Sequence, residues 1–107
     1  MFILANELHC IKYNDPSHGW LSVKRRFTGG TDISTHSYHR GQTVYLEEDS
    51  DAPNWIREME SLGYIVFIEH RNTNKSSRIR SYDPFYRSLK DTLNVVAPYN
   101  VRNGVAL

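Results

Sequence analysis

Four carboxylates stand close together in the sequence: Glu47, Glu48, Asp49 and Asp51. Hard cations such as Mg²⁺ bind carboxylate oxygens and support phosphodiester or nucleotide chemistry, so a metal site is one interpretation. Side chains alternate along a strand, however, so Glu47 and Glu48 at a strand end point to opposite faces and the run cannot all converge. A helix is expected to begin here, and its N-terminus favours negative charge. We favour the interpretation that these carboxylates cap the helix and are otherwise solvated. A surface for a basic partner is the second interpretation, and a metal site is the third.

The five histidines suggest acid–base chemistry or metal binding. His36 and His39 are three residues apart in an expected loop, where that spacing does not indicate zinc. His18 and His70 could lie near one end of the sheet, where a carboxylate such as Glu48 would orient one of them as a general base. Hydrogen-bonded loop histidines are the favoured interpretation.

A cluster of cations is the best candidate for binding an anion: Arg71, Lys75, Arg78 and Arg80. Guanidinium groups match phosphate and carboxylate geometry, and Arg78 and Arg80 would project to one side of an extended segment. Tyr38 and Tyr45 could stack on bases, or could instead fill a core or an interface. We favour the interpretation that these side chains form a solvated surface. Phosphate or nucleic-acid binding is the second interpretation, and a protein interface is the third.

Composition narrows the class of protein. The 107 residues carry a net charge of +1, too small to draw the chain to DNA or an anionic membrane, so nucleic-acid contact would need a local basic patch. Cys10 is the only cysteine, which predicts a reducing compartment. No stretch approaches the roughly 18 apolar residues of a membrane span. We expect a cytoplasmic protein with no cofactor, no metal and no membrane contact.

Several segments have the patterns of regular elements. The predicted strands are Glu7–Tyr13, Gly19–Lys24, Gln42–Glu47 and Tyr64–Ile68, and the second of these is also compatible with the entry to a short helix. Residues 28–37 are expected to form a loop because paired glycines interrupt regular structure. Further on, His70–Ser77 is predicted as a polar loop and Arg78–Tyr82 as a short edge strand or an extended arm.

The clearest local prediction is a helix from Asp51 to Leu62. Ser50 or Asp51 can cap it, Pro53 suits its first turn and Gly63 suits its C-terminus. Its apolar side chains share one face: Trp55, Ile56, Met59 and Leu62.

The apolar segment Tyr64–Ile68 predicts a strand covered on both faces, or on one face with a helix beside it. Thr43–Ile68 is then a strand, a helix and a strand, which form a parallel crossover if both strands share a sheet. A last helix is predicted from Asp83–Pro84. Its expected face comprises Phe85, Tyr86, Leu89 and Leu93.

Together these elements predict an α+β fold in one small domain, residues 1–107. We expect a mostly antiparallel sheet of four to five strands with one or two helices. The last ten or so residues lack a pattern and are predicted to be a flexible tail.

Three sequence blocks resemble a family of small uncharacterised proteins of tailed phages and bacterial genomes: Asp15–Leu21, Ser37–Asp49 and His70–Tyr82. The family's blocks are an HGWL-like element, YSYxxGxxVYLEEDCDA and HTNxxSxIRxY. This chain departs from them at Ser50, which replaces a cysteine, at the inserted Arg71, and after Val23, where the segment is shorter. The resemblance implies a phage-type accessory protein, a class whose members often bind and block a host component.

We therefore expect a non-enzymatic inhibitor or adaptor that acts in the host cytoplasm. Its partner would be a host protein or nucleoprotein complex, such as a defence system of the CRISPR kind. The carboxylates at 47–51 would face a basic partner, or Arg78 and Arg80 an acidic one.

The alternative is a protein that binds or processes a nucleotide or small phosphate ligand. Its pocket would use His18, His70, Arg78 and Arg80 around the phosphate, with Tyr38 or Tyr45 against a base. Such a pocket requires these side chains to converge, whereas an inhibitor needs only an exposed face.

Overall fold

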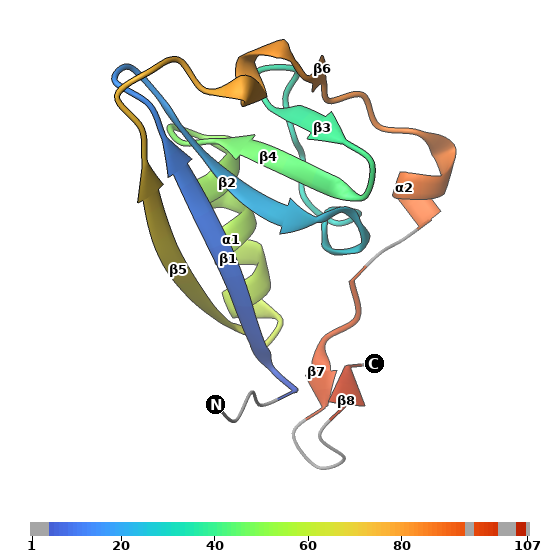
Figure 1. Ribbon diagram of the computed structural model, residues 1–107. Coiled ribbons are helices and arrows are strands. Elements are labelled where there is room, and N and C mark those ends of the chain that lie inside the picture. The colour runs from blue at the N-terminus through green and yellow to red at the C-terminus, as the bar shows by residue number, and fades with distance from the viewer. Residues whose placement is uncertain (1–4, 94–95, 101–104, 107) are drawn as a thin grey trace.

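A computed structural model describes residues 5–93, 96–100 and 105–106. They form one α+β domain, a six-stranded, mostly antiparallel sheet with a helix on one face (Figure 1). In spatial order the strands are β5 (Ile65–Asn72), β1 (Glu7–Asn14), β2 (Gly19–Lys24), β4 (Thr43–Glu47), β3 (Tyr38–Arg40) and β6 (Asp83–Pro84). The helices are α1 (Asp51–Ser61) and α2 (Leu89–Leu93), with two short 3₁₀ helices, η1 (Arg25–Phe27) and η2 (Arg78–Ser81). The predicted fold class is confirmed, with one more strand in the sheet than expected.

The strand pairing explains the strand–helix–strand unit. β1 is antiparallel to β2 and parallel to β5, while β4 is antiparallel to both β2 and β3. β4 and β5 consequently run in the same direction and share the sheet, with β2 and β1 between them. The predicted crossover through α1 is confirmed, and Gly19–Lys24 is a strand rather than the entry to a helix.

A tight turn sets the register of β3 and β4. Arg40 pairs with Thr43, which leaves a two-residue loop of Gly41 and Gln42. Gly41 has a φ of 59°, and no non-glycine residue that the structure describes has a positive φ. This pattern matches a type II′ turn, whose twist suits a hairpin and whose first central residue is normally glycine.

Alternating side chains build the core on the face that α1 covers, which we call the inner face. Among the most deeply buried side chains there are Leu21, Val44, Leu46, Trp55 and Met59, each 1% exposed or less. The predicted apolar face of α1 is confirmed, because Ile56 and Leu62 also pack against this cluster. The sheet and α1 therefore enclose one hydrophobic core.

One of the predicted carboxylates caps the start of α1, which confirms that interpretation for Glu47, but the predicted capping by Ser50 or Asp51 is wrong. Ser50 is the N-cap residue, but its side chain makes no capping hydrogen bond. The Asp51 carboxylate instead accepts hydrogen bonds from the hydroxyls of Ser34 and Ser37. Glu47 does the capping, because its carboxylate accepts the first backbone N–H groups, those of Ser50 and Asp51 among them.

β5 lies at the edge of the sheet, so the prediction of a strand covered on both faces is wrong. Ile65, Phe67 and Ile68 are 47%, 44% and 39% exposed. Val66 packs against the core, which fits the second alternative, a strand with a helix beside one face. The strand also continues through Asn72, and only the rest of the predicted polar loop lies beyond it.

The segment after that loop is helical rather than extended. Arg78–Ser81 forms η2, and the Ser77 hydroxyl accepts the backbone N–H of Ile79 at its start. A serine cap of this kind competes with strand geometry at a position where alternation suggested a strand. The prediction of an edge strand or arm is therefore wrong.

The last helix begins later than predicted and does not pack through an apolar face. Asp83–Pro84 pairs with β3 as the short strand β6. Phe85 is buried in the core at 1% exposure, whereas Tyr86, Leu89 and Leu93 are 67%, 77% and 75% exposed. The helical spacing of these residues thus reflects no shared buried surface.

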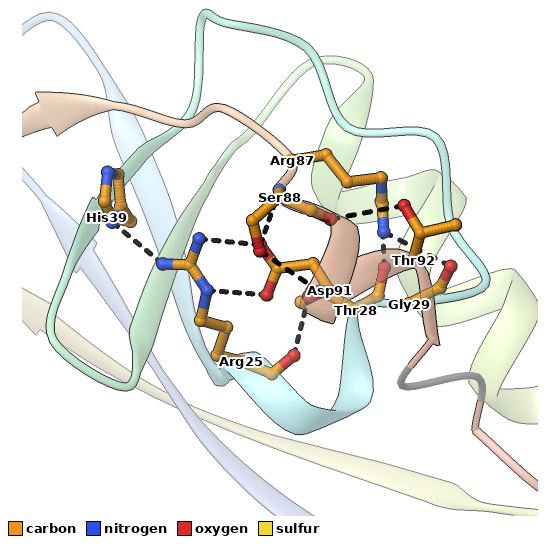
Figure 2. Close-up of polar contacts among 8 residues, drawn as sticks. All are labelled: Arg25, Thr28, Gly29, His39, Arg87, Ser88, Asp91 and Thr92. Carbon is orange, nitrogen blue, oxygen red and sulfur yellow. Dashed lines mark hydrogen bonds and ion pairs between the residues drawn. The ribbon is translucent and has the colours of Figure 1, made fainter.

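Polar contacts attach residues 85–93, which we call the strap, to the rest of the domain (Figure 2). Arg25 donates to the Asp91 carboxylate through Nε at 2.7 Å and Nη2 at 2.8 Å, and through Nη1 to His39 Nδ1 at 2.8 Å. Ser88 and Asp91 hydrogen-bond each other reciprocally, as in a capping box. Arg87 donates to the carbonyl oxygens of Thr28, Gly29 and Thr31.

The C-terminal region contains a small second sheet, β7 (Tyr99–Asn100) paired with β8 (Val105–Ala106). The remaining residues of the predicted flexible tail, 101–104 and 107, lie outside those described. Throughout the described part of the chain, no helix has both the length and the apolar character needed to cross a bilayer.

Candidate functional site

A cleft of about 530 Å³ lies where β2 begins and β4 ends. Six residues predicted to be functional line it: His18, Tyr38, Glu47, Glu48, Asp49 and Arg80. Trp20 and His36 contribute to the same wall. Residues from four separate parts of the sequence therefore meet at one end of the sheet.

A turn before β2 positions His18 and anchors η2. The Asp15 side chain is fully buried, and its Oδ1 accepts the backbone N–H groups of Ser17 and His18. Its Oδ2 accepts the N–H of Ser77, far along the chain. Short side chains of this kind commonly bond to backbone two or three residues ahead, which explains the turn.

Arg80 completes this arrangement by forming a two-pronged ion pair with Asp15. Its Nε lies 2.7 Å from Oδ2 and its Nη2 3.0 Å from Oδ1. The hydrogen bond from Arg80 lowers the pKa of the Asp15 carboxyl far below its ordinary value, and the same bond raises the pKa of Arg80. The positive charge predicted to bind an anion is therefore already balanced inside the protein.

Aromatic rings form the floor beside this ion pair. The Arg80 guanidinium lies over the Trp20 ring, 5.2 Å from its centroid. Trp20 is 4% exposed and meets Tyr38 edge-on at 6.3 Å, with the His18 ring 6.2 Å away on a tilt. Arginine–tryptophan contact of this kind adds modest attraction and fixes the guanidinium plane.

The three carboxylates of the cleft differ in their contacts. Burial disfavours ionised Glu47, but backbone N–H groups at the start of α1 outweigh it, so its pKa is lowered overall. Glu48 pairs with Lys12 at 3.3 Å. Asp49 is exposed, and no hydrogen bond or ion pair to its carboxylate is found among the described residues. With Arg80 balanced by Asp15 and Glu48 by Lys12, the cleft carries net negative charge.

The other predicted site residues lie elsewhere. Asp51 is 3% exposed and bound to serine hydroxyls beneath the cleft, so it is structural. Tyr45 packs between other tyrosines on the outer side of the sheet, opposite α1. His70 accepts a hydrogen bond from Asn14 at the end of β5, and Arg78 is exposed on η2. His70 and Arg78 thus do not join His18 and Arg80 in one pocket.

Sequence reasoning missed Asp15, Trp20 and Ser37. Asp15 was named only as the first residue of a block that resembles the phage and bacterial family, and its partner Arg80 is 65 positions away. Ser37 is fully buried, where its hydroxyl donates to Asp51 and accepts the N–H of Glu47. No local pattern distinguishes such a serine from an ordinary loop residue.

The described side chains around the cleft are not arranged as metal ligands. Within residues 5–93, 96–100 and 105–106, no three histidine, cysteine, aspartate or glutamate side chains gather as ligands would. The cleft therefore offers acidic and aromatic groups for binding rather than a preformed cation cage.

Comparisons with family models, curated proteins and solved structures gave no match to this chain. The resemblance to the phage and bacterial family stays a prediction.

Proposed function

We propose that this protein is a non-enzymatic inhibitor or adaptor that docks on a basic surface of a partner protein. The observation that carries the proposal is the meeting of Glu47, Glu48 and Asp49 at one cleft, in which the guanidinium of Arg80 is already paired with Asp15. Complementary charge across an interface steers association and fixes orientation. An acidic cleft with an aromatic floor suits lysine or arginine side chains of a partner.

A phosphate ligand suits the same cleft poorly. Phosphate requires uncompensated cations, yet the guanidinium of Arg80 is held by Asp15 and the nearby carboxylates would repel an anion. The convergence of His18 and Tyr38 with Arg80 is the feature that favours a small-ligand pocket. The net negative charge argues against it.

The resemblance noted in the sequence adds the class of partner. A phage-type accessory protein would meet a host protein or nucleoprotein complex, and a defence system of the CRISPR kind is the first to test. This step rests on analogy, whereas the docking surface rests on charge and shape.

The test compares two charge-matched variants in a binding experiment. Glu48→Gln/Asp49→Asn removes two cleft charges and leaves Glu47 to hold α1, while Glu58→Gln/Glu60→Gln removes two charges from α1 itself. Tagged wild-type protein is incubated with host lysate, and retained proteins and nucleotides are identified by mass spectrometry. Association with the purified partner is then measured at 50 and 300 mM salt.

We expect a stoichiometric partner with a basic surface, whose association rate falls at least tenfold in the cleft variant and stays unchanged in the α1 variant. The salt dependence should weaken in the cleft variant only. A partner bound equally by all three proteins would contradict the proposed surface. A retained nucleotide without any protein would overturn the proposal in favour of a ligand pocket.

A further inference from the structure

The outer face of the sheet lies opposite α1 and is turned toward the viewer in Figure 1. The strand register brings aromatic and basic side chains together on this face. Pairing of β3 with β4 and of β4 with β2 places Arg40, Thr43 and Lys24 in one lateral row. Because side chains two apart share a face, the next row along contains Tyr45 and Ile11. These positions follow from the backbone pairing and not from local sequence.

Aromatic rings lie across this face. Tyr45 is 6.3 Å from Tyr13 and 5.2 Å from Tyr82, measured between ring centroids. On the β5 side, Phe67 and His9 stack nearly parallel at 5.0 Å with an angle of 13°. Phe67 is 44% exposed, so part of its ring is open to solvent.

The same face carries two available cations. Lys24 and Arg40 are exposed, and neither forms an ion pair with any residue that the structure describes. Arg40 lies over the Tyr82 ring, 5.2 Å from its centroid. The carboxylate of Glu69 on β5 is paired with Arg71 at 3.0 Å. The Arg40–Lys24 end of this face is therefore basic, in contrast to the acidic cleft at its other end.

We propose that this outer face binds single-stranded nucleic acid, through bases stacked on exposed Phe67 and on the half-buried tyrosine rings, with phosphates held by Lys24 and Arg40. Aromatic rings accept the flat face of any unpaired base, and cations beside them contact the phosphate backbone. The row from Arg40 to Phe67 crosses five strands, or about 19 Å at the usual strand spacing, enough for a few nucleotides. A duplex keeps its bases stacked inside and offers this face only phosphates.

This surface differs from the docking cleft in position, sign of charge and ligand. Its function would complement an inhibitor of a nucleoprotein complex, but the inference does not depend on that role. It rests on the strand register, the partly exposed aromatic rings and the two cations without ion pairs among the described residues.

The test measures fluorescence anisotropy of labelled 12-nucleotide polythymidine, 12-nucleotide polyuridine and a 12-base-pair duplex, at salt concentrations from 20 to 200 mM. Lys24→Gln/Arg40→Gln removes the two cations, and Arg57→Gln/Lys90→Gln is the charge-matched control on the two helices. Phe67→Ser removes an exposed ring from the face, and Tyr86→Ser removes one from the strap as its control. Circular dichroism melting verifies that each variant is folded.

We expect binding to both single strands, at least tenfold tighter than to the duplex. Loss of Lys24 and Arg40 should reduce the slope of log affinity against log salt by about 1.4, since each contact contributes about 0.7 on single strands. Phe67→Ser should weaken binding about tenfold, within the range for one stacked base. The polythymidine and polyuridine arms distinguish DNA from RNA as the natural ligand.

Three results would overturn the inference. The first is no binding to either single strand at 20 mM salt. The second is an equal loss of affinity in the face variants and in their matched controls. The third is a concentration-dependent dimer that Phe67→Ser dissociates in the absence of any oligonucleotide binding, which would assign the face to a second copy of the chain.

Discussion

Replacing Asp91 by asparagine should release the strap and measure how firmly it is attached. Asp91 is 4% exposed, and its carboxylate accepts two hydrogen bonds from Arg25 and two from Ser88. Asparagine has nearly the same shape but only one acceptor oxygen and no charge. Breaking a buried ion pair costs about 3–5 kcal/mol when the partner stays buried. Arg25 is 16% exposed and the strap is short, so partial rehydration should reduce the cost to about 2 kcal/mol.

The assay is thermal unfolding at pH 7, together with limited trypsin digestion. A loss of about 2 kcal/mol should lower the melting temperature by roughly 10 °C for a domain of this size. Arg87 donates to three carbonyl oxygens while the strap is docked. If trypsin cleavage after Arg87 requires the strap to detach, the cleavage rate should rise about 30-fold in the variant. Asp32→Asn, at an exposed aspartate, is the control and should change stability by less than about 0.5 kcal/mol.

The pH dependence provides an independent check on the same ion pair. The hydrogen bond from Arg25 lowers the pKa of Asp91 below its ordinary value of 3.8. A group whose pKa is lower in the folded state stabilises the fold above its unfolded pKa and loses that contribution as the pH falls through the folded value. The difference between wild type and Asp91→Asn should therefore be smaller at pH 3 than at pH 6. A melting temperature lowered by less than 2 °C at pH 7, or an equal difference at both pH values, would refute the reasoning.

Three further predictions concern the core, a turn and the thiol. Leu46→Ala, at a fully buried position, should cost about 3 kcal/mol in urea unfolding, whereas Leu89→Ala, 77% exposed, should cost less than about 0.5 kcal/mol; similar losses would show that the last helix packs after all. Gly41→Ala should cost about 1 kcal/mol because the turn requires a φ of 59°, although the added methyl would meet nothing within 4 Å; an unchanged midpoint would rule out a strained turn. Burial raises the pKa of Cys10 to about 11, so a thiol reagent at pH 8 should label native protein at least 100-fold more slowly than unfolded protein, and rapid labelling would contradict a buried thiol.

Local patterns were sufficient for much of the fold. Helix α1 was predicted within a residue, because Pro53, Gly63 and the spacing of Trp55 and Met59 all act within one or two turns of the chain. The strands β1, β2 and β4 were predicted for the same kind of reason. The secondary-structure prediction failed where the local sequence supported two structures about equally. η2 has the alternation of a strand, and a serine cap decided against it.

The candidate site was predictable in part. His18, Tyr38, Arg80 and the carboxylates at 47–49 were singled out by residue type, and the fold brings these six together. His70 and Arg78 had equal chemical promise but lie outside the cleft. Nothing in their local sequence distinguishes them from the residues that converge.

The sequence by itself determined the composition of the domain, its α+β class and the position of α1, since these depend on interactions between residues close along the chain. The tertiary structure alone decided that Arg80 is balanced by Asp15, 65 positions away, and that β5 is an exposed edge rather than a central strand. Charge balance and strand order depend on contacts between distant segments, which are fixed only when the core closes. Arg80 was predicted to bind an anion, but because Asp15 balances its charge, the cleft that contains it is acidic.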